Sequence, residues 1–161
     1  MALKGDRHEL ETDISYFMNE TASQGFFASL STVGSGAAMD DAAALVTLAA
    51  DGSGKIPAGC LLNDMVNLDL TRQHINWHKD EVQIGGKVTL LKKGWVVTNA
   101  ILGTPAVGNK AYLGGSGNLT TTPNVPIVIS GVTVGSHNPQ IGVFMSKKDA
   151  DGYAKVGVNV D

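Results

Sequence analysis

Two histidines spaced four residues apart are the most suggestive chemical feature of the sequence. His74 and His78 would share one face of a helix, where they could chelate zinc. However, Ile75 stands beside the first histidine, where the zinc-protease motif has a glutamate. The segment also alternates polar and apolar residues as a strand does, and residues four apart on a strand lie about 14 Å apart, too far to bind one ion. We therefore expect a solvated or interfacial strand face here and no bound metal or cofactor.

Carboxylates occur in pairs, at Asp40-Asp41, Asp80-Glu81 and Asp149/Asp151. Glycoside hydrolysis requires two carboxyl groups that face each other across a cleft, whereas close neighbours in sequence are typical of turns and solvated faces. The third pair resembles the start of a calcium loop, but the glutamate that would close such a loop is missing. The sequence also lacks the Gly-x-Ser-x-Gly elbow of serine hydrolases. We predict that the protein is not an enzyme.

The composition limits the classes of partner. A chain of 161 residues is expected to form one domain, and its single cysteine, Cys60, is expected to be a small buried hydrophobe. The net charge of −3 and the isolated lysine pairs make nucleic acid an unexpected partner. We find no apolar run of the roughly 20 residues that a membrane span needs and no secretory signal, so we expect no membrane association and synthesis in a cytoplasm.

The elements that would position any site are predicted to be strands. Residues 82–99 predict two strands around a turn at Gly85-Gly86, with Val82, Ile84, Val88 and Leu90 on one buried face. Residues 92–94 predict a polar break before a second β-rich run that begins at Trp95.

Apolar runs separated by glycine, proline or polar turns predict further strands within residues 25–33, 45–48, 60–62, 100–102, 111–113, 127–130, 132–134, 141–145 and 154–160. In the last run Ala154, Val156, Val158 and Val160 are predicted to face inward. Residues 114–126 are polar and predict a long surface loop. The sequence therefore predicts an all-β fold, a compact β-barrel or jelly-roll-like sandwich of short antiparallel strands.

Residues near the N-terminus alternate with a period of two, which favours a strand. Leu10, Thr12, Ile14, Tyr16 and Met18 would share one face. Two interpretations remain open: the segment is the first strand of the core, or it is an extended arm that pairs with a sheet edge of another chain. The second interpretation divides the chain into an N-terminal arm, residues 1–24, and a β-barrel or sandwich body, residues 25–161.

Four short segments resemble the capsid decoration (cement) proteins of tailed bacteriophages. They are Gly-Cys-Leu-Leu-Asn-Asp-Met-Val at 59–66, Asp-Leu-Thr-Arg at 69–72, Ile-Asn-Trp-His-Lys-Asp at 75–80 and Lys-Gly-Trp-Val-Val-Thr-Asn at 93–99. The resemblance extends over roughly residues 10 to 160, and its best-matching block is residues 59–99.

The resemblance implies a β-barrel or jelly-roll-like body, often a homotrimer, at three-fold sites between hexamers of the major capsid protein. The protein would then lie on the outer capsid surface of the virion after synthesis in the host bacterial cytoplasm. Its partners would be the major capsid protein and further copies of itself. The arm face formed by Leu10, Thr12, Ile14, Tyr16 and Met18 is the candidate capsid contact.

Two other classes of function remain as alternatives. A carbohydrate-binding β-sandwich would use Trp77 or Trp95 as a platform for a sugar ring, and an exposed indole beside polar groups would favour it. A small hydrolase or metal enzyme would be favoured by one tightly bound zinc ion.

Overall fold

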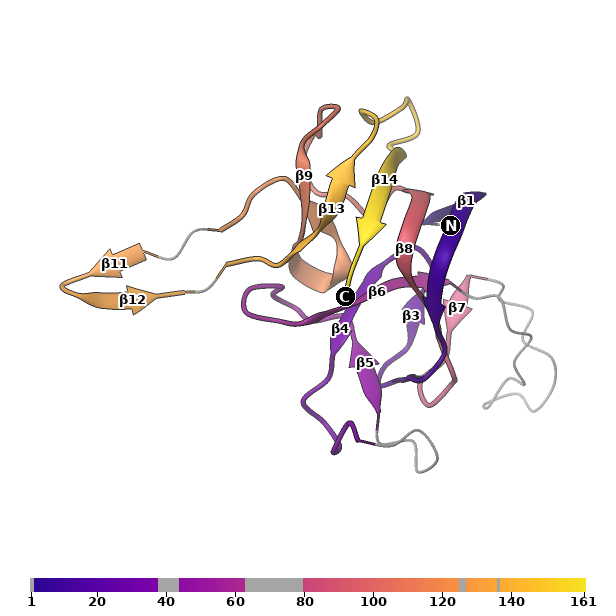
Figure 1. Cartoon of the computed structure of the whole chain (residues 1–161), viewed down its shortest axis with the longest axis horizontal. Helices are drawn as coiled ribbons and strands as arrows, with labels where there is room; N and C mark the ends of the chain where they lie inside the picture. Colours follow the sequence, from indigo (N-terminus) through magenta and orange to yellow (C-terminus); the bar gives the residue numbers. More distant parts are fainter. Residues whose placement is uncertain (1, 38–43, 63–79, 125–126, 136) are drawn as a thin grey trace.

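The computed structural model describes residues 2–37, 44–62, 80–124, 127–135 and 137–161 (Figure 1). The strands are β1 Leu3–Asp13, β2 Phe17–Met18, β3 Ala22–Ser23, β4 Phe27–Leu30, β5 Leu45–Thr47, β6 Pro57–Leu62, β7 Glu81–Val82, β8 Thr89–Thr98, β9 Lys110–Leu113, β10 Leu119–Thr120, β11 Ile127–Ile129, β12 Val132–Val134, β13 Gln140–Phe144 and β14 Ala154–Asn159. One 3-10 turn, η1 Gly115–Gly117, is the only helical element among these residues. The prediction of an all-β fold is confirmed.

Ten strands form one mixed sheet in the order β10-β9-β13-β14-β8-β6-β4-β5-β2, with β1 also paired to β8. The pairing of β2 with β5 is parallel, and the other pairings in this sheet are antiparallel. Two small ribbons, β3-β7 and β11-β12, complete the set. No pairing among the described residues joins the ends of the order, β10 and β2, so the sheet forms a compact, sandwich-like body without the closure of a barrel.

The central strands are buried on both faces, because neighbouring residues on them belong to two different apolar clusters. Phe27, Cys60 and Leu91 lie in the larger cluster, whereas their sequence neighbours Ala28, Leu61 and Leu90 lie in the smaller one. Side chains on a strand alternate between faces, so β4, β6 and β8 separate the two cores. Such strands read as continuous apolar runs.

Strand β8 passes through the segment that was predicted to be a polar break, so that prediction is wrong. Lys93 pairs with Glu11 and Leu91 with Thr12, which leaves Lys92 as an extra residue opposite β1. Beyond this bulge the buried parity changes, since Leu91 and Val96, five positions apart, lie in the same cluster. The polar residues therefore mark a change of face within one strand.

The turn at Gly85-Gly86 is confirmed, since the amide of Gly86 donates to the carbonyl of Gln83 at 3.0 Å. Val82, Val88 and Leu90 are buried as predicted. The prediction for Ile84 is wrong, because this residue lies within the turn and its side chain is exposed. A strand pattern that is extended into a turn assigns the turn residues to a face that they do not have.

Strand β14 is confirmed as predicted, with Ala154, Val156, Val158 and Val160 buried. Residues 114–126 are only partly a surface loop, because Leu119 is completely buried in β10. Residues 100–102 form no strand and contribute one isolated bridge, from Ile101 to Leu119.

Candidate functional site

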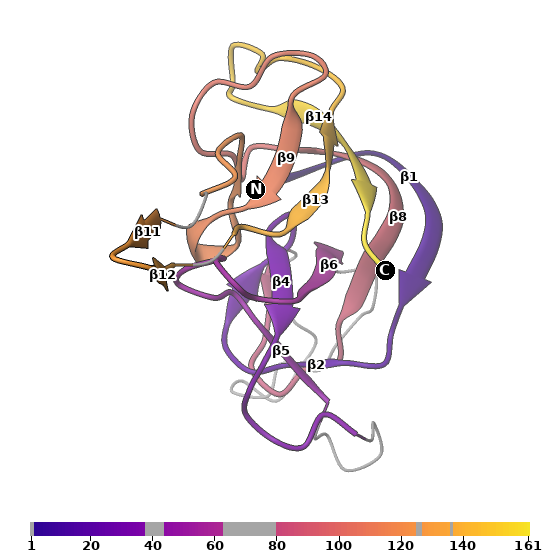
Figure 2. The same ribbon diagram turned by 60° about the vertical axis from the view of Figure 1, so that its left-hand side comes forward.

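The N-terminal segment lies along β8 in the same chain and is fixed at both ends. Leu3 is buried in the larger cluster and Met18 in the smaller one. The residues of β1 that follow Leu3 are exposed, except for Arg7 and Asp13, which are partly buried. Figure 2 shows the strand at the edge of the body. The strand is thus held mainly by its pairing with β8 and by its ends. The division into an arm at 1–24 and a body at 25–161 stays a prediction.

The expectation that five alternate side chains share one face is wrong. Glu9 pairs with Gly94 and Glu11 with Lys93, so Leu10 is an extra residue in β1 and the alternation is interrupted there. β1 ends at Asp13, before the predicted strand does.

The five predicted contact residues separate into two groups. Leu10 is 71% exposed and Ile14 is 49% exposed, and Thr12 is exposed beside them. Tyr16 packs against the smaller core, and Met18 is completely buried within it. Leu10, Thr12 and Ile14 are therefore the members of the set that a partner can reach in this conformation.

Ion pairs connect β1 to the body. Lys93 Nζ lies 3.2 Å from Glu11 Oε2, and Lys92 Nζ lies 3.8 Å from Asp13 Oδ2. Lys4 Nζ lies 3.5 Å from Asp149 Oδ2. β8 is the only strand that pairs with β1 within the described ranges. Charged side chains on such an edge oppose unselective pairing with other sheets.

The outer face of the sheet carries a row of four cross-strand neighbours. Val143 pairs with Gly157, Gly157 with Trp95, and Trp95 with His8. The Lys155 ammonium lies 3.6 Å from the centroid of the indole, and the imidazole of His8 stacks on it at 6.4 Å. A sugar that stacked on Trp95 would compete with these two contacts.

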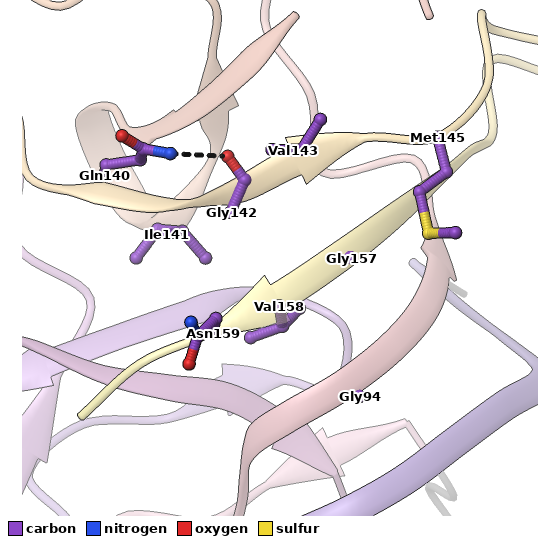
Figure 3. A pocket seen from close by; sticks show the side chains of 9 residues that line it. All are labelled: Gly94, Gln140, Ile141, Gly142, Val143, Met145, Gly157, Val158 and Asn159. Atoms are coloured by element: carbon purple, nitrogen blue, oxygen red, sulfur yellow. Dashed lines mark hydrogen bonds between the residues drawn. The ribbon is translucent and has the colours of Figure 1, made fainter. Parts of the chain in front are cut away.

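A shallow groove of about 510 Å³ crosses the outer face at Gly157 (Figure 3). Gly94, Gly142 and Gly157 contribute only backbone to its lining, and Val143 and Met145 stand beside them. The lining contains no charged residue. A second hollow, of about 540 Å³, shares part of this lining and extends the groove to Trp95 on β8 and to His8 and Leu10 on β1. Unlike the first, it is also lined by charged residues, Lys93 and Asp161.

The β11–β12 hairpin projects from the body in both ribbon views (Figures 1 and 2). Ser130 and Gly131 have φ values of 51° and 79°, as a two-residue type I′ turn requires. Val128, Ile129 and Val132 are all more than half exposed. The two strands were predicted, but their departure from the body was not. The absence of Asp, Glu, Lys and Arg between Lys110 and Lys147 is the sequence signal for an unusual surface.

The remaining chemical candidates have structural roles where they are described. Cys60 is completely buried, as predicted, and burial raises the pKa of its thiol. Asp149 Oδ1 accepts hydrogen bonds from the amides of Tyr153 and Asp151, both at 2.9 Å, so this carboxylate forms a turn. These two backbone hydrogen bonds and Lys4 lower the pKa of Asp149.

Several predictions concern residues outside the described ranges, namely those for His74, His78, Trp77 and Asp40-Asp41. Within the described ranges, no group of three or more His, Cys, Asp or Glu side chains is arranged to hold a metal ion. The same residues include no helix with the length and apolar character of a membrane span.

The chain was compared with known protein families and with curated proteins. It matches no family model and no curated protein sequence.

Proposed function

We propose that the protein is a structural virion protein that decorates the outside of a phage head as an oligomer and stabilises contacts between major capsid proteins. The observation that carries this proposal is β1, an 11-residue strand that presents Leu10 and, just beyond its end, Ile14 to solvent. The resemblance of residues 59–99 to cement proteins supplies the class of partner. The low charge, 17% of residues, suits a surface that partners cover.

The energetics favour binding through several copies. Burying a fully exposed side chain of this size contributes about 1.5–3 kcal/mol. Because Leu10 is 71% exposed and Ile14 is 49% exposed, their burial would contribute roughly 2–4 kcal/mol together. Association itself costs an estimated 4–15 kcal/mol, so one copy binds weakly. Copies linked in an oligomer make the later contacts intramolecular, and avidity then adds a factor of about 10²–10⁴. Binding to the assembled shell but not to its separate subunits stabilises the shell by mass action.

The test is stoichiometric addition to expanded, empty heads that lack the protein. Wild-type protein should cosediment with heads up to a fixed ratio and raise their disruption temperature. Ile14→Asp should lose this binding and stay folded, because the side chain is half exposed. The matched control is Val33→Asp, at an apolar position of similar exposure outside β1, and it should bind normally. Heads that take up no wild-type protein would refute the proposal.

The second candidate, a carbohydrate-binding module, rests on Trp95, which lies in the outer groove with Asn159 and Asp161. It ranks second because Lys155 and His8 already contact the indole ring. Retention on polysaccharide columns that Trp95→Ala abolishes would favour it over capsid decoration.

A further inference from the structure

The β11–β12 hairpin exposes apolar side chains on both of its faces. Ile129 pairs with Val132, so these two residues share one face of the hairpin. Val128, which is next to Ile129 and pairs with Thr133, lies on the opposite face. An isolated two-stranded hairpin is marginally stable in water and gains stability from packing on a further surface. Neither strand of the hairpin pairs with another strand in the described part of the chain.

The part of the outer groove at Gly157 resembles the hairpin in lacking charge, whereas the adjoining hollow toward β1 is lined by Lys93 and Asp161. The lining at Gly157, from Gly94, Met145 and residues of β13 and β14, contains no charged side chain, and the hairpin also has none. At Gly157 the missing side chain opens a gap between Val143 and Trp95 in the cross-strand row. An apolar side chain that enters this gap meets the uncharged lining, and the nearby Lys155 ammonium keeps its contact with the Trp95 ring.

The hairpin does not fill the groove of its own chain. None of its described side chains lines either hollow, and it points away from the body in both views (Figures 1 and 2). The two complementary surfaces therefore lie on different parts of one molecule. Contacts between two such surfaces are head-to-tail, and they produce a ring when the rotation between copies closes.

We propose that the hairpin of one copy docks in the outer groove of the next copy and so builds the oligomer. The proposal builds on the oligomeric part of the proposed function and names the surfaces that form it. The occupant of the groove is a second copy of this chain, because the chain itself carries an apolar, uncharged, projecting element of the chemistry that the groove accepts.

The test uses one variant on each surface of the full-length chain. Ile129→Asp places a charge on the exposed hairpin. Gly157→Leu fills the groove, and a Cβ at this position meets first the flexible Met145 side chain, at 3.3 Å. Val143→Asp, on the groove wall, is a second groove variant that adds a charge and leaves Gly157 unchanged. The matched control is Val107→Asp, at an apolar, exposed loop position outside both surfaces.

Sedimentation velocity across a concentration series measures self-association, and circular dichroism confirms that each variant is folded. Wild type and Val107→Asp should form the same oligomer. The dissociation constant for self-association should be about tenfold larger, or more, for the hairpin variant and for each groove variant than for wild type. A mixture of Ile129→Asp with a groove variant retains one intact hairpin and one intact groove, so it should form a dimer that does not grow further.

Self-association of folded Ile129→Asp equal to that of wild type, or a wild-type monomer at all concentrations, would overturn the proposal. So would a mixture that stays monomeric. If Ile129→Asp loses binding to heads but keeps its oligomer, the hairpin contacts the shell and the proposal is also wrong. An oligomer that depends on hairpin and groove but does not bind heads would support the proposal and refute only the capsid function.

Discussion

Gly94 allows β1 to lie against β8, and its replacement should separate the two strands. Its φ of +142° is unfavourable for an L side chain, and a Cβ at this position would overlap the carbonyl oxygen of His8. The neighbouring atom belongs to backbone, so no side-chain rotation removes the overlap. Gly94→Ala must therefore distort β8 or move β1.

The magnitude follows from comparing these two responses. Retaining the paired geometry costs about 1–3 kcal/mol of backbone strain in addition to the overlap. Releasing the middle of β1 loses a few hydrogen bonds, each worth a net ~1 kcal/mol. Its residues there are mostly exposed, and the conformational entropy that they regain on release, at most about 1–2 kcal/mol each, offsets part of this loss. Release is the cheaper response, so we expect the free energy of unfolding to fall by about 2 kcal/mol or less.

Gly59 and Gly5 provide the matched comparisons. Gly59 has nearly the same φ, +143°, and its Cβ would lie 2.6 Å from the carbonyl oxygen of Leu91. β6 cannot leave β8 without opening both cores, so Gly59→Ala should cost more than Gly94→Ala, about 3 kcal/mol or more. Gly5→Ala meets nothing within 4 Å and should change stability by less than about 0.5 kcal/mol.

Urea unfolding gives the stabilities, and hydrogen exchange gives the protection of the β1 amides. Gly94→Ala should lose protection mainly in β1, while the rest of the sheet keeps it. Equal stabilities of Gly94→Ala and wild type, with unchanged protection of β1, would refute the reasoning. Equal losses for Gly94→Ala and Gly59→Ala would show that β1 is not released.

Three further predictions follow. Amides of β1 should exchange faster than those of β8 in the free protein and become protected on heads; protection equal to that of β8 before binding would identify a permanent core strand. Cys60 should react with thiol reagents only at the rate of unfolding, because burial raises its pKa. Its ionisation in the unfolded chain should lower stability as the pH rises above about 8.5, and Cys60→Ala should remove that decrease. Asp149 has a lowered pKa, so its contribution to stability is present above the ordinary carboxyl pKa and is lost as the pH falls through the lowered value. The difference in urea midpoint between wild type and Asp149→Ala should shrink in acid, and a constant difference would contradict this.

The fold class and most strands could be predicted because apolar residues and turn residues alternate along the chain at regular distances. β14 shows this at its clearest, since one face is buried throughout. The bulges could not be predicted in the same way. Leu10 in β1 and Lys92 in β8 are extra residues relative to the partner strand, and pairing partners are not visible in local sequence. The predicted face from Leu10 to Met18 was wrong because the bulge takes Leu10 out of the alternation and because β1 ends at Asp13, before Tyr16 and Met18.

The candidate surfaces were harder to predict because they depend on which residues of other strands lie beside a given residue in space. Gly157 reads as an ordinary outward position of β14, and it forms a groove only because Val143 and Trp95 flank it. Val128 and Ile129 read as core residues, since β-branched side chains in short strands are usually buried. Their exposure follows from the position of the hairpin outside the main sheet, and pattern and propensity contain no information on that position.

The distribution of charge along the chain differs between its two exposed strand edges, and this difference is compatible with the assembly proposed above. An exposed edge invites unselective pairing, and charged side chains oppose it. β1 has Lys4, Asp6, Glu9 and Glu11 on its exposed length, so its edge resists chance partners. The hairpin has no charged residue, so only the binding of a partner can prevent its exposed edges from pairing unselectively. If each hairpin fills a neighbour's groove, ring closure leaves no hairpin free, so the apolar segment limits the oligomer instead of propagating it. Charge would then be absent from the hairpin and from the groove at Gly157, and concentrated along β1, where docking to a shell is proposed.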